Sequence, residues 1–341
     1  MAIVRSLSIR LLLALLAVAA ALLLGEMALR ARHALKAGTA EPPGFIEPDA
    51  RLGWKANAFR VFGDVDAARP KLLVIGDSFT QAVNVPAGKT YAALLAAALD
   101  VEVFSYGGGG FGTLQELMVL EDVIDTIDPD IVLLQFCSND FINNSVELES
   151  KSSINNNNGL VRPYLSSSGA IVYRSAFFES AFLSGLLQRS RLFRSLAARL
   201  YVRPAESVEL AVARDPGHRG FQESVAVTRI LLRRFKDRVG SGRALLVFTA
   251  EGARTRVATV PAQYQAYMGV AEETLVRVLG ALQIAFVAGV ADAVADREAS
   301  GAVVKDFDGA HWNELGHRIV AQELQRAAAF RRLRTPEENP A

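Results

Sequence analysis

Asp308 and His311 stand three positions apart in an Asp-Gly-Ala-His motif near the C-terminus. At this spacing a carboxylate can bind the Nδ1–H of an imidazole and leave Nε2 free to take a proton from a nucleophile. The chain has four histidines, so few imidazoles compete for this role. We interpret His317 as a packing or surface residue of the last predicted helix. His33 and His218 are discounted because they fall in the juxtamembrane segment and in an insertion.

Ser78 is the candidate nucleophile for such a base. It follows a short apolar run at residues 71–75 and a glycine, Gly76, which permits a tight turn. A serine directly after a buried parallel strand lies at the carboxyl edge of the sheet, where open α/β sheets bind their ligands. Its hydroxyl is a weak nucleophile that needs a base and a group that orients this base. The alternative for Ser78 alone is a helix-capping or turn serine.

Two further segments could donate hydrogen bonds to an oxyanion. The glycine-rich loop at residues 107–113 can present bare backbone N–H groups, and it lacks the lysine and hydroxyl ending of a P-loop. Asn139 follows a third apolar run and can offer a side-chain amide. A flexible turn is the alternative for the loop, and an Asx turn is the alternative for Asn139. The candidate nucleophile, base and hydrogen-bond donors support one another as a single site, because all of them fall at one edge of the predicted sheet.

The elements that must position these residues alternate between strands and helices. Short apolar runs typical of buried parallel strands are followed by segments with helical periodicity. The predicted strands are at residues 71–75, 101–105, 131–136, 244–249 and 283–288, and the predicted helices are at 88–99, 114–127, 221–239, 262–280 and 313–329. This alternation predicts an α/β fold, a three-layer α/β/α sandwich with a central parallel sheet.

Residues 143–220 interrupt the alternation, and we interpret them as an insertion after the third strand. A polar segment at 150–159 precedes an apolar and basic stretch at 177–201. Such an insertion can form a lid or a substrate-facing surface, and the alternative is a helical excursion without a role in the site. Its arginines could contact an anionic partner, although we favour a solvated helix face. They are Arg189, Arg191, Arg194 and Arg199.

The N-terminus carries a candidate membrane segment. Residues 11–25 contain no charged side chain and follow Arg5 and Arg10, a pattern typical of a membrane anchor or of a signal peptide. We favour an uncleaved anchor, because the small residues that could direct cleavage lie inside the apolar run. A buried core helix is a third interpretation. Positive charges on both sides leave the orientation of the segment undecided.

Composition limits the classes of function further. Hydrophobic residues make up 51% of the chain, which excludes a disordered protein. Lys and Arg number 37 and Asp and Glu number 36, so no excess of positive charge favours a nucleic-acid partner. Cys137 is the single cysteine, which excludes an intrachain disulfide and a zinc site of several thiolates.

The chain divides into five predicted parts, with the insertion inside the fourth. They are a short tail at 1–10, an anchor or signal at 11–29, a linker and lead-in at 30–66, one catalytic domain at 67–330 and a tail at 331–341.

The candidate residues resemble the four ordered blocks of the SGNH/GDSL hydrolases. The blocks correspond here to the Gly-Asp-Ser that ends at Ser78, to Gly110, to the Cys-Ser-Asn-Asp around Asn139, and to Asp308 with His311. The similarity runs from about residue 71 to residue 324 and is weakest in 143–243. Flanking phrases such as DARLGW (49–54) and HWNELGHRIVAQEL (311–324) are similar to a membrane-anchored bacterial branch.

Two positions depart from the family pattern. Cys137 replaces the glycine of the third block and could crowd the approach to Asn139, and Ser105 stands where an asparagine often begins the second block. Neither departure removes an atom that the implied chemistry uses.

The resemblance implies a flavodoxin-like fold and a serine esterase that acts through an acyl-enzyme. In that mechanism His311 takes the proton of Ser78 and Asp308 orients the imidazole. The implied oxyanion donors are the N–H groups of Ser78 and Gly110 and the amide of Asn139, with Gly109 as the alternative within the loop. No metal or cofactor is required.

The implied substrate is an O-acyl or O-acetyl ester of a cell-envelope glycan, with lipid esters next. The implied place is the outer, periplasmic face of a bacterial cytoplasmic membrane. An O-acyltransferase that passes the acyl group to a sugar hydroxyl is the first alternative. A non-catalytic glycan-binding component of an envelope assembly is the second, and the intact candidate triad argues against it. The sequence names no protein partner.

Overall fold

A computed structural model of the chain describes residues 2–37, 46–56, 60–61, 63–153, 160–200, 206–257 and 262–333. Parts of the predicted linker (30–66), of the polar segment (150–159) and of the C-terminal tail (331–341) lie outside these residues.

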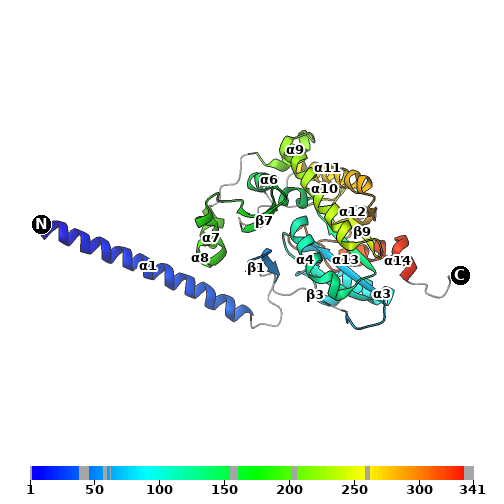
Figure 1. The fold of residues 1–341 in the computed structure, drawn as a ribbon, viewed down its shortest axis with the longest axis horizontal. Coiled ribbons are helices and arrows are strands. Elements are labelled where there is room, and N and C mark those ends of the chain that lie inside the picture. The colour runs from blue at the N-terminus through cyan, green and yellow to red at the C-terminus, as the bar shows by residue number, and fades with distance from the viewer. Residues whose placement is uncertain are drawn as a thin grey trace.

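A six-stranded sheet forms the centre of the molecule (Figure 1). Its strands are β3 (Arg60–Val61), β4 (Lys71–Gly76), β5 (Glu102–Gly107), β6 (Ile131–Phe136), β9 (Ala244–Thr249) and β10 (Ala285–Phe286). The spatial order is β10-β9-β6-β4-β5-β3, and all neighbours are parallel except β3 and β5. Strands β4 and β6 are apolar at almost every position because helices cover both of their faces.

The strand order explains where a ligand site can form. The chain begins the parallel sheet at β4, places β5 on one side, and then returns to place β6 on the other side. This is the flavodoxin-like order, and it puts a topological switch point at the carboxyl ends of β4 and β6. Residues that follow these two strands therefore lie where open α/β sheets of this order bind their ligands.

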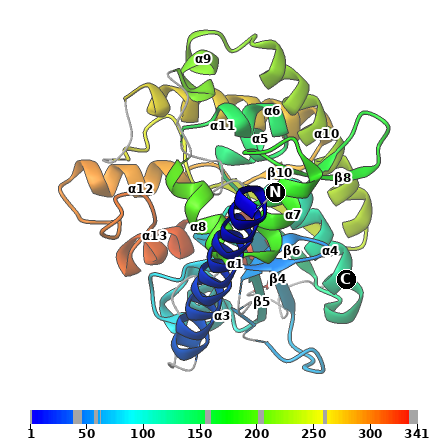
Figure 2. The same ribbon diagram turned by 90° about the vertical axis from the view of Figure 1, so that its left-hand side faces the viewer.

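Helices cover the two faces of the sheet in separate layers (Figure 2). One layer contains α4 (Thr113–Ile127), α10 (Arg219–Val239) and α11 (Ala262–Leu282), and the other contains α3 (Tyr91–Leu99), α12 (Val290–Ala299) and α13 (Glu314–Leu324). Alternate side chains of β4 serve the two layers, because successive residues of a strand point to opposite faces. Leu73 and Ile75 face the first layer, and Leu72 and Val74 face the second. The arrangement confirms the predicted three-layer α/β/α sandwich.

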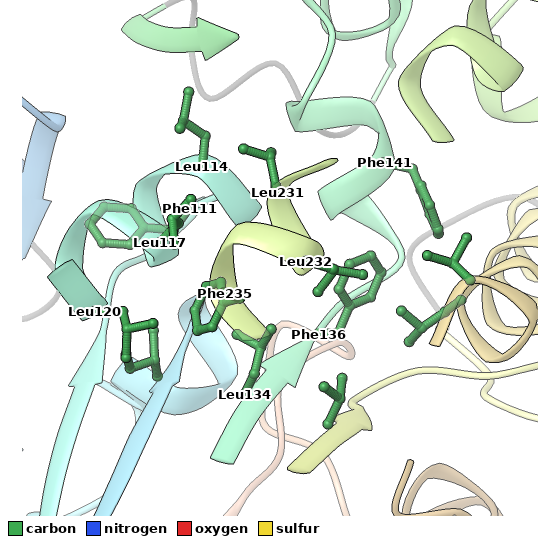
Figure 3. Close-up of a cluster of buried hydrophobic side chains, with 14 of the residues drawn as sticks. Phe111, Leu114, Leu117, Leu120, Leu134, Phe136, Phe141, Leu231, Leu232 and Phe235 are labelled. Carbon is green, nitrogen blue, oxygen red and sulfur yellow. The ribbon is translucent and has the colours of Figure 1, made fainter. Parts of the chain in front are cut away.

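The layer around α4 and α10 is densely apolar (Figure 3). Leu120 of α4 and Phe235 of α10 are fully buried on the side of the sheet where Leu134 of β6 lies. Removing one such phenylalanine side chain typically costs about 3–5 kcal/mol. This packing holds the strands, and hence the loops at their carboxyl ends, in a fixed register.

The element boundaries follow local signals closely in most places. Helix α4 ends at Ile127 with Asp128 in the left-handed region (φ 49°), before Pro129, as the sequence predicts. The predicted strand at 283–288 is shorter, because only Ala285 and Phe286 pair with β9 at the edge of the sheet. The predicted helix at 313–329 is divided into α13 and α14 (Ala328–Leu333).

The predicted insertion at 143–220 contains a β-hairpin that was not predicted from the sequence. The hairpin is formed by β7 (Val161–Leu165) and β8 (Ile171–Ser175). The helices around it are α6 (Val146–Lys151), α7 (Ala181–Arg189), α8 (Arg191–Leu200) and α9 (Val208–Arg214).

Strand β7 packs against a second hairpin made of β1 (Ile46–Asp49) and β2 (Gly53–Ala56). A Cβ atom at Gly53 would lie 2.1 Å from the carbonyl oxygen of Val161, and Gly53 has a φ of +80°. Glycine is therefore required where the two hairpins meet.

Helix α1 (Ala2–Ala37) projects from the body of the molecule (Figure 1). Its segment Ile9–Arg32 is long and apolar enough to cross a membrane, and a signal sequence passes the same test. Large apolar side chains of this segment are exposed, among them Leu13, Leu16 and Leu23. The end of α1 nearer the body packs against α8.

Candidate active site

The turn after β4 presents Ser78 at the carboxyl edge of the sheet. Ser78 is the first residue of a short helix, α2 (Ser78–Gln81), and Asp77 caps this helix by accepting a hydrogen bond from the N–H of Phe79 (3.0 Å). A Cβ atom at Gly76 would lie 2.4 Å from Thr80 Oγ1, so the tight turn requires glycine there. Ser78 is half-buried between the buried Asp77 and Phe79.

The structure brings Ser78, His311 and Asp308 together. His311 Nε2 lies 2.8 Å from Ser78 Oγ, although the two residues are 233 positions apart in the chain. His311 Nδ1 lies 2.5 Å from Asp308 Oδ2. The imidazole and the carboxylate are about one-third exposed, at 33% and 36%. This is the linear arrangement in which one carboxylate orients an imidazole and the imidazole accepts a proton from a hydroxyl.

The loop before α13 builds the Asp308–His311 unit locally. Asp308 Oδ1 accepts hydrogen bonds from the N–H groups of Ala310 (2.9 Å) and His311 (3.0 Å). Partial burial acts to raise the pKa of Asp308, but these hydrogen bonds and the neighbouring imidazole hold it below its ordinary value. Asp308 is therefore ionised at neutral pH and can stabilise a positive charge on His311.

The ring of Phe79 packs against the imidazole and against Trp312. The ring centroid of Phe79 lies 5.0 Å from that of His311 and 4.6 Å from that of Trp312. The carbonyl of Trp312 accepts a hydrogen bond from Asn84 Nδ2 (2.8 Å). These contacts tie the loop of His311 to the segment that follows Ser78, which restricts the orientation of the ring.

The glycine-rich loop approaches α2 very closely. A Cβ atom at Gly107 would lie 2.1 Å from the backbone nitrogen of Gln81. The N–H of Gly109 donates to Gln81 Oε1 (2.7 Å), so this group is already engaged. Gly110 has a φ of +70°, and among the described residues no acceptor takes its N–H. Gly110 rather than Gly109 therefore offers a free backbone donor.

Asn139 begins α5 (Asn139–Asn143) after β6, and its side chain is only 8% exposed. Its Oδ1 is buried without a hydrogen-bond partner among the described residues. The strand-closing hydrogen bond is made instead by Asp140, whose Oδ2 accepts from the N–H of Cys137 (2.7 Å). Because its Oδ1 has no partner among the described residues, Asn139 does not form the Asx turn that was the alternative for it.

The position that departs from the family pattern, Cys137, is fully accommodated. Its side chain is buried, and Sγ lies 3.3 Å from Glu251 Oε2. Burial, with the charge of Glu251, raises the pKa of this thiol well above its usual range. Cys137 is therefore a packed thiol and not a reactive one.

Buried carboxylates lie beneath the site. Burial raises the pKa of Asp77 to about 6, although its hydrogen bond from Phe79 and the nearby His311 oppose this effect. Burial also raises the pKa values of Asp140 and Glu116 well above their ordinary values. Among the residues described, no group of histidine, cysteine, aspartate and glutamate side chains is arranged to hold a metal ion.

Two of the remaining histidines have structural contacts. His317 is buried, accepts a hydrogen bond from the N–H of Tyr91 (3.2 Å) and stacks on its ring, so it is a packing residue as interpreted. His218 caps α10 by accepting from the N–H of Phe221 (3.3 Å). The side chain of His33 lies outside what the structure describes.

Two residues that hold the glycine-rich loop were not assigned from the sequence. Trp54 Nε1 donates to the carbonyl of Gly109 (2.9 Å), and Arg162 Nη2 donates to the carbonyl of Gly110 (2.8 Å). Trp54 ends the phrase DARLGW (49–54), whose residues have no role that the sequence alone indicates. Arg162 lies in the insertion, and no local pattern distinguishes it from the other arginines there.

Comparison with known proteins gives one family and several similar folds. The GDSL-like Lipase/Acylhydrolase family matches residues 74–319 of the chain. No curated protein matches the sequence.

Three solved structures illustrate the similarity. The first is LAE5, an alpha/beta hydrolase enzyme from the metagenome of Lake Arreo in Spain, with 16% identity, coverage of 80% of this chain and 100% of that chain, and a TM-score of 0.43. A member of the lipolytic protein G-D-S-L family from Veillonella parvula has 13% identity, coverage of 76% and 98%, and a TM-score of 0.42. A catalytic mutant of an acetylxylan esterase from Geobacillus stearothermophilus has 15% identity, coverage of 75% and 93%, and a TM-score of 0.42.

Proposed function

The chain belongs to the GDSL-like lipase/acylhydrolase family, and from this premise we propose that it is a serine-dependent ester hydrolase that works through an acyl-enzyme. The observation that carries the proposal is the 2.8 Å separation between Ser78 Oγ and His311 Nε2. At this distance the imidazole can take the hydroxyl proton as the oxygen attacks a carbonyl carbon.

The reaction then follows from the positions of three side chains. His311 accepts the Ser78 proton, and Ser78 Oγ forms a bond to the ester carbonyl carbon. The protonated His311, stabilised by ionised Asp308, gives its proton to the departing alcohol, and the acyl group stays on Ser78. A water molecule, deprotonated by His311, next attacks the acyl-enzyme and releases the acid and the free serine.

The negative charge on the carbonyl oxygen needs donors that are in place before the reaction. In this proposal they are the N–H groups of Ser78 and Gly110 and the amide of Asn139. The free Gly110 N–H supports its part in this assignment. Asn139 is placed by its position at the start of α5, directly after the carboxyl end of β6. Gly109 is less suitable, because its N–H is engaged by Gln81.

We assign residues 67–330 to one hydrolase domain held at a membrane by an uncleaved α1. The anchor is supported by Glu26 of α1, which accepts hydrogen bonds from Ser190 Oγ (2.9 Å) and from the N–H of Leu192 (2.9 Å) at the start of α8. The helix is thereby part of the folded structure. We place the domain on the periplasmic side, with O-acyl or O-acetyl esters of envelope glycans or lipids as substrates.

Purified full-length protein in detergent should hydrolyse p-nitrophenyl acetate and react with a fluorophosphonate probe. Ser78→Ala should abolish both, since it removes the nucleophile. Persistent labelling of Ser78→Ala would show that another residue is the nucleophile. Adding an oligosaccharide acceptor and analysing it by mass spectrometry separates release of free acid from transfer of the acyl group to a sugar.

A further inference from the structure

The peptide unit between Gly109 and Gly110 is fixed through its carbonyl. A trans peptide is planar, so its C=O and its N–H point in opposite directions. Trp54 Nε1 binds the carbonyl oxygen of Gly109 at 2.9 Å and thereby sets the direction of the Gly110 N–H. We propose that Trp54, with Arg162, is a positioning residue that aims the Gly110 N–H at the oxyanion. The inference rests on the proposed function.

Arg162 reinforces this arrangement at two points. Its guanidinium carbon lies 4.5 Å from the ring centroid of Trp54, within the range of a cation–π interaction. Its Nη2 donates to the carbonyl of Gly110 at 2.8 Å, so the peptide unit between Gly110 and Phe111 is held as well. Trp54 and Arg162 are 0% and 1% exposed, which keeps water from competing for these hydrogen bonds.

The charge of Arg162 is balanced within the insertion. Arg162 Nε donates to Glu149 Oε2 at 2.8 Å, and Tyr164 OH donates to the same oxygen at 2.7 Å. Apolar side chains of similar volume often stabilise a core as well as a buried ion pair does. The directional hydrogen bonds to the loop therefore explain a buried arginine here better than stability alone. In this proposal the insertion supports the glycine-rich loop at residues 107–113.

Trp54→Phe tests this inference, because it keeps an aromatic ring beneath Arg162 and removes the Nε1 donor. We expect kcat for p-nitrophenyl acetate to fall by about 10-fold or more, up to the roughly 10²–10³-fold loss of a whole oxyanion donor, with KM unchanged. The slope of the pH–rate profile should not change, since the base is untouched. Tyr173→Phe is the matched control, because it removes a hydroxyl that donates to the carbonyl of Arg51 (2.7 Å) in the same pair of hairpins.

Arg162→Met and Arg162→Lys separate positioning from folding. The methionine variant should lose kcat, and the lysine variant should recover part of it, because lysine can still donate to the Gly110 carbonyl. Thermal unfolding and circular dichroism identify any variant that fails to fold. Wild-type kcat in a folded Trp54→Phe protein, with Ser78→Ala inactive, would overturn the inference and leave the proposed function intact. A wild-type protein without esterase activity would instead count against the function itself.

The start of α8 contacts α1 at Glu26, directly after the apolar run at residues 11–25. Glu26 lies about 12 Å along the helix from Val18, the midpoint of the apolar run, and half of a hydrocarbon core is about 15 Å. A carboxylate at this depth needs partners. Within α1 it pairs with Arg30 Nε (2.7 Å), and at the start of α8 it accepts from Ser190 Oγ and the N–H groups of Arg191 and Leu192. If α1 spans the bilayer, the first turn of α8 must therefore lie at the boundary between lipid tails and headgroups.

The surface of α7 and α8 fits this position. Phe182, Leu196 and Leu200 are large apolar side chains that are 73%, 42% and 76% exposed. Arg189 and Arg199 are exposed beside them. Exposed apolar side chains beside arginines are the composition of helices that lie in a membrane interface. We infer that α7 and α8 rest on the headgroups of anionic phospholipids where α1 leaves the membrane.

Site-specific fluorescence in proteoliposomes tests this contact without any use of the enzymatic reaction. In a Cys137→Ser background, an NBD label at Leu200→Cys should show blue-shifted emission and quenching by brominated lipids. The same label at Val303→Cys, a position that is 76% exposed on the body, should show neither. Replacing Arg189 and Arg199 with glutamine should reduce the effect at position 200 in vesicles that contain phosphatidylglycerol and not in vesicles of phosphatidylcholine alone.

A label at Leu16→Cys reports on α1 in the same vesicles. Quenching at position 16 together with a water-exposed label at position 200 would overturn the inferred surface and leave the anchor in place. Absence of quenching at position 16 would show that α1 does not span the bilayer, and the inferred surface would fall with it. Neither result bears on the role of Ser78.

Discussion

At the scale of single residues, the chemistry depends on a proton that moves between two atoms. His311 can accept the Ser78 proton only while its Nε2 is unprotonated, and ionised Asp308 fixes the tautomer that presents Nε2 to the serine. Hydrogen bonds hold the pKa of Asp308 below its ordinary value, so this carboxylate stays charged throughout the neutral range.

Asp308→Asn should lower kcat by about 10²–10⁴-fold, because the amide cannot stabilise the imidazolium. Initial rates with p-nitrophenyl acetate provide the measurement. A wild-type rate in folded Asp308→Asn protein would contradict the assignment of Asp308 as the group that orients the base.

The raised pKa of Asp77 predicts that the stability of the protein depends on pH. Its pKa is about 6 in the folded protein and has its ordinary value of 3.8 in the unfolded chain. The folded state therefore binds the Asp77 proton more tightly than the unfolded chain does. The stability that this bound proton contributes is fully present below a pH of about 4 and is lost as the pH rises through about 6.

Asp77→Asn keeps the capping oxygen and cannot ionise. The free energy of unfolding of this variant, relative to that of the wild type, should increase between about pH 4 and about pH 7.5. Urea unfolding at several pH values measures the difference. A difference that does not change with pH would show that the buried Asp77 does not carry this titration.

At the scale of elements, the site depends on how closely the glycine-rich loop approaches the turn after β4. Gly107→Ala should reduce stability by about 1–3 kcal/mol and lower kcat, because the new methyl group would meet the backbone of α2. Gly88→Ala is the control, since no atom lies within 4 Å of the added carbon. Unfolding and initial rates should separate the two variants. Equal behaviour would mean that the loop can move away from α2 without loss.

Much of the order of strands and helices was predictable from local sequence patterns. The strands around Leu73, Leu133 and Val247 are continuous apolar runs, which is the pattern of a strand covered on both faces. The two hairpins were not predictable in the same way. Strand β8 is largely exposed, and Trp54 gains its role only through contact with Gly109, 55 positions away. Such a contact depends on tertiary packing and leaves no periodic signal in the sequence.

The residues of the candidate site likewise divide into those that local sequence features predict and those that depend on tertiary contacts. Ser78, Asp308 and His311 could be predicted because each lies beside a local feature, a strand end or a helix start, and the topology of a parallel sheet joins them. Arg162 could not, because its meaning comes from a buried partner, Glu149, and from the carbonyl of Gly110. The preference for Gly110 over Gly109 likewise needed the hydrogen bond from Gly109 to Gln81.

At the scale of the whole molecule, a series of contacts joins the candidate anchor to the glycine-rich loop. Glu26 of α1 holds the start of α8, and Gln188 of α7 donates to the carbonyl of Asp49 (3.2 Å) in the hairpin of β1 and β2. Trp54 of the same hairpin holds the carbonyl of Gly109. The support of the proposed oxyanion site and the attachment of α1 are therefore built from adjoining elements, and α1 leaves the body on the side where β1, β7, α7 and α8 lie (Figure 1).

Peptide mapping of the fluorophosphonate adduct tests the central claim most directly. We expect the added mass on the peptide that contains Ser78, and we expect His311→Ala to slow its formation by about 10²-fold or more, since the hydroxyl loses its base. An adduct on another serine, or an unchanged labelling rate in folded His311→Ala protein, would contradict the claim that these two residues act together.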